Sequence, residues 1–136
     1  MALCICREFA KRGFVVFAVE YRTGVLYDIV DRKYTAAQQV LAIYRAIQDG
    51  RGAVRSIIKR QRNYKKFNDP YKIDTNNIFL AGASAGSFIT LGLAYYQSQA
   101  MIDSVTPGVK AVLGTINPDF YYGDSTIKYE KKIKGV

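Results

Sequence analysis

A serine between two glycines is the feature of this sequence that most directly suggests chemistry. Residues 82–86 read Gly-Ala-Ser-Ala-Gly, which matches the G-x-S-x-G pattern of a nucleophile elbow, a sharp strand-to-helix turn that exposes a serine hydroxyl. Ser84 would attack a carbonyl carbon, and the backbone N–H of Ala85 at the start of the following helix would help to hold the oxyanion. The pattern therefore predicts acyl transfer through an acyl-enzyme on Ser84.

The residues on either side of this pentapeptide fit the predicted turn. An apolar run at residues 77–81 precedes it, and an amphipathic stretch at residues 87–96 follows it. Gly82 and Gly86 would let the helix approach the strand closely while Ser84 adopts a strained backbone conformation. The alternative interpretation is that the glycines only make a tight turn and that Ser84 caps the helix, which serine commonly does.

The catalytic base that such a serine needs is missing from the sequence. A serine hydroxyl is a poor nucleophile until a neighbouring base takes its proton, and the usual base is an imidazole. The sequence contains no histidine. Asp103, Asp119 and Asp124 follow the serine, but without a histidine to orient we interpret them as loop and turn residues. We therefore predict that this chain alone has no hydrolase activity.

From about residue 6 to residue 136 the sequence resembles the middle of an α/β-hydrolase of the carboxylesterase and lipase type. Beyond the pentapeptide, the likeness rests on residues 9–16 with 20–22, 48–55 and 71–78. The resemblance implies that Ser84 is the nucleophile and Ala85 an oxyanion donor, with Gly82 and Gly86 as elbow glycines. It implies a small-molecule carboxylic ester as substrate and no cofactor. Peptidase and thioesterase activities remain alternatives within the same chemistry.

The sequence also departs from the pattern of that family. Such enzymes carry a His-Gly-Gly type oxyanion loop upstream of the first helix predicted here, and their catalytic acid and histidine follow later strands. None of these segments is present, and Glu20 stands where an aspartate is usual. We therefore interpret residues 1–136 as a single partial α/β-hydrolase domain, truncated at both ends.

The order of predicted elements indicates an α/β fold, a partial doubly wound parallel sheet with crossover helices. The predicted elements are a helix ending at Gly13, a strand at 14–19, a helix beginning near Thr35 with a kink or break at 49–52, a strand at 78–82, a helix from Ala85, a loop at 98–125 and the start of a third strand at 131–136. We expect the helix from Ala85 to pack deep against the sheet through a stripe of Phe88, Leu91 and Tyr95, which Ile89, Leu93 and Tyr96 widen. Thr35 and Gln38 form a capping-box pattern at the start of the second helix.

The charge of the chain invites comparison with proteins that bind nucleic acid. The formal net charge is +9, and many of the basic residues lie between residues 51 and 66. Val54, Ile57 and Ile58 recur at helical spacing in this run, so we predict that its basic residues form a solvated face. No zinc-finger, RNP-type or helix-turn-helix pattern accompanies the charge, and we predict no nucleic-acid partner.

The remaining composition describes a globular chain with few special sites. It is 49% hydrophobic and 23% charged. The longest apolar run, residues 14–19, is far short of the roughly 20 residues that span a bilayer. Cys4 and Cys6 are poorly spaced for a mutual disulfide, so we interpret them as buried apolar residues, and without histidine we predict no metal site. No targeting segment or compartment is indicated.

A non-catalytic role is the alternative from a different functional class. A sheet of about three strands leaves open edges, and exposed edges favour pairing with a partner or with a second copy of the chain. On this hypothesis the chain would act as an interaction module, and self-association through its sheet edges would be expected.

Overall fold

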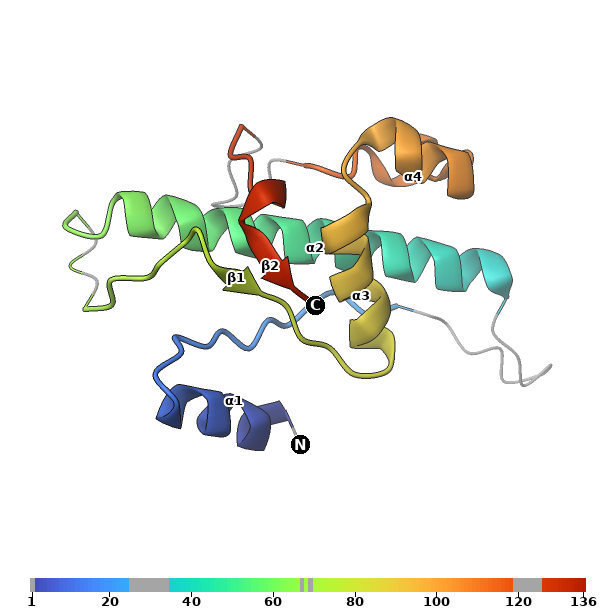
Figure 1. Cartoon of the computed structure of the whole chain (residues 1–136). Helices are drawn as coiled ribbons and strands as arrows, with labels where there is room; N and C mark the ends of the chain where they lie inside the picture. The colour runs from blue at the N-terminus through green and yellow to red at the C-terminus, as the bar shows by residue number, and fades with distance from the viewer. Residues whose placement is uncertain (1, 25–34, 67, 69, 119–125) are drawn as a thin grey trace.

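The computed structural model describes residues 2–24, 35–66, 68, 70–118 and 126–136 (Figure 1). These residues form a mostly helical structure of mixed α/β character with one two-stranded sheet. In chain order the elements are α1 (Ala2–Lys11), α2 (Ala36–Arg62), β1 (Ile78–Phe79), α3 (Ala85–Tyr95), α4 (Gln99–Val105), α5 (Val109–Leu113), the 3-10 helix η1 (Glu130–Lys132) and β2 (Ile133–Gly135).

Helix α2 is the long central element, and its start agrees with the prediction. The Thr35 hydroxyl accepts the Gln38 N–H at 3.2 Å, and the Gln38 side chain accepts the Thr35 N–H, so the capping box is confirmed. The predicted break at 49–52 is wrong, because α2 is one continuous helix of 27 residues. A Cβ on Gly50 would lie 2.8 Å from Leu93 Cδ1, so glycine here allows α3 to pack closely.

The hydrophobic core lies between α2 and the elements that follow it in the sequence. Ile47 of α2 packs directly against Gly92 of α3, where an added Cβ would lie 2.4 Å from Ile47 Cδ1. The buried core residues are Tyr44, Ala46, Ile47, Val54, Ile58, Ile89, Leu93, Ile102, Val109, Ile116, Ile127 and Tyr129. The core thus brings residues 44–58 together with residues from three later helices and from the approach to β2.

Helix α3 turns only one of its apolar faces towards this core. Ile89 and Leu93 are buried, as predicted. Phe88, Leu91 and Tyr95, which the sequence suggested would pack deep against the sheet, are 59%, 49% and 64% exposed. That part of the prediction is wrong, because among the described residues α2 covers α3 on one side and no element covers the stripe of these three side chains.

The sheet consists of β1 and β2, which pair in parallel (Figure 1). Ile78 lies opposite Ile133, and the Leu80 N–H donates to the Gly135 carbonyl at 2.9 Å. Both strands lie where the sequence predicts strands, and their parallel direction is confirmed. The larger doubly wound sheet that we predicted is reduced, within the described residues, to these two short strands.

The strand predicted at residues 14–19 is absent, and this is the main correction to the predicted fold. The segment is extended but forms no sheet pairing within the described chain. Phe14, Val15, Phe17 and Val19 are 43–47% exposed although they belong to the longest apolar run of the sequence. A strand needs a neighbouring strand for its backbone hydrogen bonds, and none of the described residues forms one that pairs with this segment.

The predicted loop at 98–125 contains two short helices. Ser98 caps α4 by accepting the Met101 N–H at 3.2 Å. Gly108 and Gly114, with φ of 82° and 76°, flank α5 at its start and its end. Glycines that we interpreted as loop residues therefore mark helix boundaries, because their left-handed conformations begin and end a short helix.

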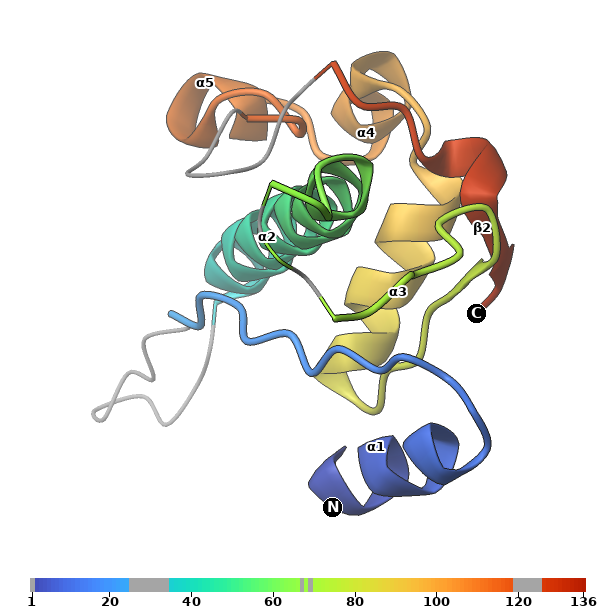
Figure 2. The same ribbon diagram turned by 90° about the vertical axis from the view of Figure 1, so that its left-hand side faces the viewer.

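Helix α1 lies apart from the core, beyond the extended segment that follows it (Figure 2). The segment leaves the helix through Gly13, whose φ of 90° fits the predicted helix end. Cys4 is exposed and Cys6 is half-buried. The interpretation of both cysteines as buried apolar residues is therefore wrong, because α1 has no packed neighbour on their side among the described residues.

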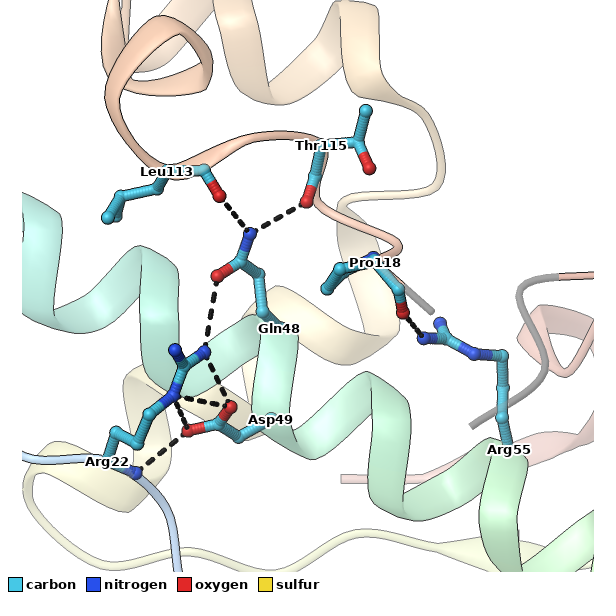
Figure 3. A network of polar contacts seen from close by, with 7 residues as sticks. All are labelled: Arg22, Gln48, Asp49, Arg55, Leu113, Thr115 and Pro118. Atoms are coloured by element: carbon cyan, nitrogen blue, oxygen red, sulfur yellow. Dashed lines mark hydrogen bonds and ion pairs between the residues drawn. The ribbon is translucent and has the colours of Figure 1, made fainter. Parts of the chain in front are cut away.

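A polar network fixes the end of the extended segment to α2 (Figure 3). The Arg22 backbone N–H and its Nε donate to Asp49 at 2.8 and 2.9 Å, and the Arg22 guanidinium reaches the Gln48 amide oxygen at 3.4 Å. Gln48 in turn donates to the carbonyls of Leu113 and Thr115 at 3.0 and 2.7 Å. The segment, α2 and the residues after α5 are thereby held in one arrangement.

Candidate functional site

Ser84 occupies a strained position between β1 and α3. Its φ is 53° and its ψ is −120°, and among the described residues Asn68 is the one other non-glycine residue with a positive φ. Such a conformation costs a residue with a Cβ about 1–3 kcal/mol and is found chiefly where function requires it. Ser84 is exposed, so the strained turn presents the serine to solvent.

The two glycines of the pentapeptide have different roles in this turn. A Cβ on Gly82 would lie 2.3 Å from the Gly86 carbonyl oxygen, so the backbone leaves room only for glycine at that position. A Cβ on Gly86 would meet no atom within 4 Å. Gly82 is thus required by the close approach of the turn to α3, whereas no contact among the described residues requires a glycine at position 86.

Among the described residues, the hydrogen bonds of the turn leave the Ala85 N–H at the start of α3 without an acceptor. The Gly86 N–H donates to the Ala83 carbonyl and the Ser87 N–H to the Ser84 carbonyl, both at 2.9 Å. The N–H of Ala85, by contrast, has no acceptor among the described residues. This free donor adjoins Ser84 at a helix N-terminus, a place that favours negative charge. Its position is suited to an oxyanion.

The sequence offers the serine no imidazole base. The sequence has no histidine, and the described residues hold no cluster of three or more acidic, cysteine or histidine side chains that could bind a metal. Asp103 lies on α4 and accepts a hydrogen bond from Gln99 at 2.7 Å, which fits its interpretation as a structural residue. Asp119 and Asp124 lie outside the described residues. The turn therefore holds an exposed serine and a backbone donor, without a histidine that could act as a base.

An apolar cavity of about 170 Å³ lies beside the turn, and we call it the sheet groove. It lies between residues 17–21 of the extended segment and residues 79–81, and side chains of α2 and α3 line it as well. Gly86 lines it, but Ser84 does not. The sheet groove thus adjoins the serine turn without containing the serine.

The buried arginines of α2 were missed by sequence reasoning. We predicted that the basic residues from 51 onward would form a solvated face, but Arg51 and Arg55 are 0% and 1% exposed. Both guanidinium groups donate to the Asn117 amide oxygen, at 2.7 and 3.0 Å, and Arg55 also donates to the Pro118 carbonyl at 2.8 Å. Arg51 donates in addition to the Tyr96 carbonyl.

The positions of these arginines along the helix could have indicated, from the sequence, that they are buried. Residues 51 and 55 lie one turn apart on the stripe that also carries Ile47 and Ile58. The Arg51 guanidinium lies 5.7 Å from the centroid of the Tyr129 ring, and burial raises the pKa of the Tyr129 hydroxyl to about 12. Arg51 and Arg55 therefore belong to an internal polar layer, whereas Arg60, Arg62, Lys65 and Lys66 are exposed, as predicted for this basic run.

Comparisons of the chain with models of protein families, with curated proteins and with solved structures found no match. In the part of the chain that the structure describes, no helix is both long and apolar enough to cross a membrane.

Proposed function

We propose that this chain carries the nucleophile of a serine esterase of the α/β-hydrolase type. Ser84 is the nucleophile, Ala85 N–H is one oxyanion donor, and Gly82 with Gly86 are the elbow glycines. The observation that carries the proposal is the backbone conformation of Ser84, with φ 53° and ψ −120°. This conformation, and not the G-x-S-x-G pattern alone, distinguishes a nucleophile elbow from an ordinary turn.

Two other helix caps in the same chain argue against a capping role for Ser84. Thr35 and Ser98 have negative φ values of −76° and −139°, and each hydroxyl accepts a helix N–H. Ser84 has a positive φ and makes no cap hydrogen bond with its side chain. A cap would gain nothing from the strain, whereas a nucleophile gains an exposed hydroxyl beside a free backbone donor.

The chemistry follows from this geometry once a base is present. As the Ser84 oxygen attacks the ester carbonyl, its proton passes to the base and the oxyanion is held partly by Ala85 N–H. The alcohol then leaves with that proton, and water releases the acid from the acyl-enzyme. An imidazole base cannot come from these 136 residues, which contain no histidine. The proposal is therefore that the chain works as one part of a larger catalytic unit.

A fluorophosphonate probe tests this proposal on two proteins. The coding DNA is sequenced on both sides, and the isolated chain is compared with the product of the extended reading frame. We expect no labelling of the isolated chain and labelling of Ser84 in an extended protein that supplies an oxyanion loop, an acid and a histidine. Ser84→Ala should abolish the labelling, and the matched control Ser104→Ala, on exposed α4 surface, should retain it.

Two results would contradict the proposal in different ways. Labelling of Ser84 in the isolated chain would show that no external base is needed. An extended protein with a complete set of catalytic groups that stays unlabelled would show that Ser84 is not a nucleophile.

A non-catalytic interaction module is the second candidate, and the exposed apolar segment at residues 14–19 favours it. If the coding DNA has a start at Met1 and a stop after Val136, and the isolated chain is not labelled, this candidate becomes the better one. The partner would then cover the open sheet edges.

A further inference from the structure

Nearly all of the net charge of the chain lies in three short segments. Residues 59–66, 70–77 and 126–134 contain ten lysine or arginine residues and two acidic ones, so their formal net charge is +8. The rest of the chain, with Asp69 counted in it, contains ten basic and nine acidic residues. The positive charge is therefore a local feature of these segments and not a general property of the composition.

The fold brings the three segments to one end of the molecule. The Ile73 N–H donates to the Gln61 amide oxygen at 2.8 Å, which fixes residues 70–77 to the end of α2. Lys132 Nζ donates to Asn76 Oδ1 at 2.6 Å, which fixes η1 to the same segment. Figure 2 shows the C-terminal end of α2 towards the viewer, with the chain that follows α2 and the residues before β2 beside it. We call this surface the basic end, and its cations are Lys59, Arg60, Arg62, Lys65, Lys66, Lys72, Lys128, Lys131, Lys132 and Lys134.

The cations of the basic end are accessible to solvent and largely without carboxylates to neutralise them. Eight are exposed, and Lys59 and Lys132 are half-buried. None of the ion pairs among the described residues lies at the basic end. The two acidic residues of the segments, Asp74 and Glu130, accept hydrogen bonds from residues within three positions of themselves. The described carboxylates therefore leave most of this positive charge uncompensated.

Stabilisation of a helix end accounts for only part of this charge. Lys59, Arg60 and Arg62 lie in the last turn of α2, where cations interact favourably with the helix dipole. That effect is confined to the last turn, so it does not extend to Lys72 or to the four lysines at residues 128–134. Like charges that the fold brings together repel one another and lower stability. Their concentration at one end indicates an anionic partner.

The side chains of the basic end favour the phosphates of a nucleic-acid strand as that partner. Eight of the ten cations are lysines, which bind phosphate as point charges. Anionic lipid headgroups would attract them too, but the three segments expose no aliphatic side chain that could enter a bilayer. Their one exposed large hydrophobic side chain is Tyr71, at 59%, and an exposed aromatic ring beside lysines is suited to stacking on a base.

We propose that the basic end binds single-stranded nucleic acid through its phosphates, with Tyr71 stacking on a base. The basic run at residues 51–66 alone fits a solvated helix face, and the lysines that residues 70–77 and 126–134 add to it change that interpretation. Lysine–phosphate contacts and base stacking do not read sequence, so the binding is independent of sequence. This surface does not depend on the proposed esterase, because Ser84 lies outside the three segments.

The experiment measures binding of the full chain to a fluorescein-labelled oligouridylate of about 20 nucleotides by anisotropy, at salt concentrations from about 50 to about 200 mM. We expect the logarithm of the binding constant to fall with the logarithm of the salt concentration with a slope of about −3, which corresponds to about four neutralised phosphates. Ser84→Ala should bind as the parent chain does.

Two double variants with the same loss of charge localise the binding. Lys65→Gln with Lys66→Gln removes two exposed cations of the basic end, and Arg7→Gln with Lys110→Gln removes two exposed cations elsewhere. We expect the first variant to bind about tenfold more weakly at low salt, with a slope reduced by about 1, and the second to bind within about twofold of the parent chain.

A pair of variants at Tyr71 tests the stacking. Tyr71→Ala should weaken binding of the single strand about fivefold or more, whereas Tyr71→Phe keeps the ring and should bind as the parent chain does. A duplex of the same length, whose bases are already stacked on each other, should bind the parent chain and Tyr71→Ala equally.

Four results would overturn the proposal. Binding to phosphatidylserine vesicles without binding to the oligonucleotide would assign the basic end to a membrane surface. Equal weakening by the two double variants would show attraction by the net charge alone. Unchanged single-strand binding by Tyr71→Ala would exclude the stacking contact. No binding of the oligonucleotide at low salt would show that the basic end is only a solvated surface.

Discussion

The most apolar run of the chain is partly exposed, and two arginines of α2 are buried. Both findings are the reverse of what the residue types suggest. Four large side chains of residues 14–19 are 43–47% exposed, whereas Arg51 and Arg55 are 0% and 1% exposed. The arginines lie under residues that supply hydrogen-bond acceptors, among them Asn117. The apolar run lies beside the sheet groove, and no described element covers its exposed side chains.

This difference shows that burial depends on the neighbours that a residue finds as well as on its type. A charged group can be buried when its donors are satisfied, and an apolar group stays exposed when the element that would cover it is missing. One side of α2 places Arg51 and Arg55 beside hydrogen-bond acceptors, whereas the apolar residues 14–19 on its other side stay partly exposed. The following variants test that contrast, from the largest expected effect to the smallest.

Removing an apolar side chain should matter only where it is covered. Ile47 is 1% exposed and Val15 is 43% exposed. We expect Ile47→Ala to lower the free energy of unfolding by about 3 kcal/mol, because it loses buried area and leaves a cavity, and Val15→Ala to lower it by less than about 1 kcal/mol. Urea denaturation measures both. Similar losses would mean that residues 14–19 are covered in solution, and the contrast would fail.

The contact between α2 and α3 should be sensitive to one added methyl group. Gly92→Ala would place a Cβ 2.4 Å from Ile47 Cδ1, and we expect a loss of about 2 kcal/mol from overpacking. Gly52→Ala is the matched control, since its Cβ meets nothing within 4 Å, and it should stabilise α2 by about 0.5–1 kcal/mol. Thermal unfolding of the two variants should therefore shift in opposite directions. A stabilised Gly92→Ala would refute the close packing.

The strain at Ser84 should be measurable as stability. Glycine tolerates a φ of 53° and a ψ of −120°, but alanine keeps the Cβ that makes this conformation costly. We expect Ser84→Gly to raise the free energy of unfolding by about 1 kcal/mol after the entropy cost of glycine, and Ser84→Ala to leave it nearly unchanged. Equal stability of the two variants in urea would argue against strain, and with it against the observation that supports the nucleophile.

The buried polar side of α2 should respond to alkaline pH through Tyr129. Its pKa is raised by burial from 10.0 to about 12, so the folded chain keeps the hydroxyl proton to higher pH than the unfolded chain does. This contribution to stability is complete below about pH 10 and is lost as the pH rises towards 12.

Tyr129→Phe removes this pH dependence and supplies its test. At pH 7 we expect a change below about 0.5 kcal/mol, because the buried hydroxyl has no hydrogen-bond partner among the described residues. Between pH 10 and 12 the parent chain should lose stability more steeply than the variant. Parallel pH profiles would indicate that the Tyr129 hydroxyl is solvated.

Local signals in the sequence predicted several elements correctly. The capping box at Thr35 located the start of α2, and the change from an apolar run to small residues located β1 and the turn at Ser84. These predictions succeeded because the interactions that decide them lie within a few residues of each other. The left-handed glycine at position 13 belongs to the same class.

The predictions that failed depended on contacts between distant segments. Whether residues 14–19 form a strand depends on a neighbour that periodicity does not reveal. Likewise, Gly50 was interpreted as a helix breaker because its contact with Leu93 joins residues 43 positions apart. At the candidate site, residue types indicated Ser84, but its strained φ and the free Ala85 N–H required the backbone geometry.

The parallel pairing of β1 with β2 has a consequence for the order in which the chain assembles. Parallel strands need a long crossover connection. Here Ile78 can pair with Ile133 only after α3, α4 and α5 have been synthesised. Contacts between residues so far apart form slowly, whereas α2 and α3 can pack as soon as residue 95 is synthesised. During synthesis on the ribosome, β1 is therefore an unprotected edge while residues 80–133 are translated, and chaperones that bind extended apolar segments could bind it in that interval.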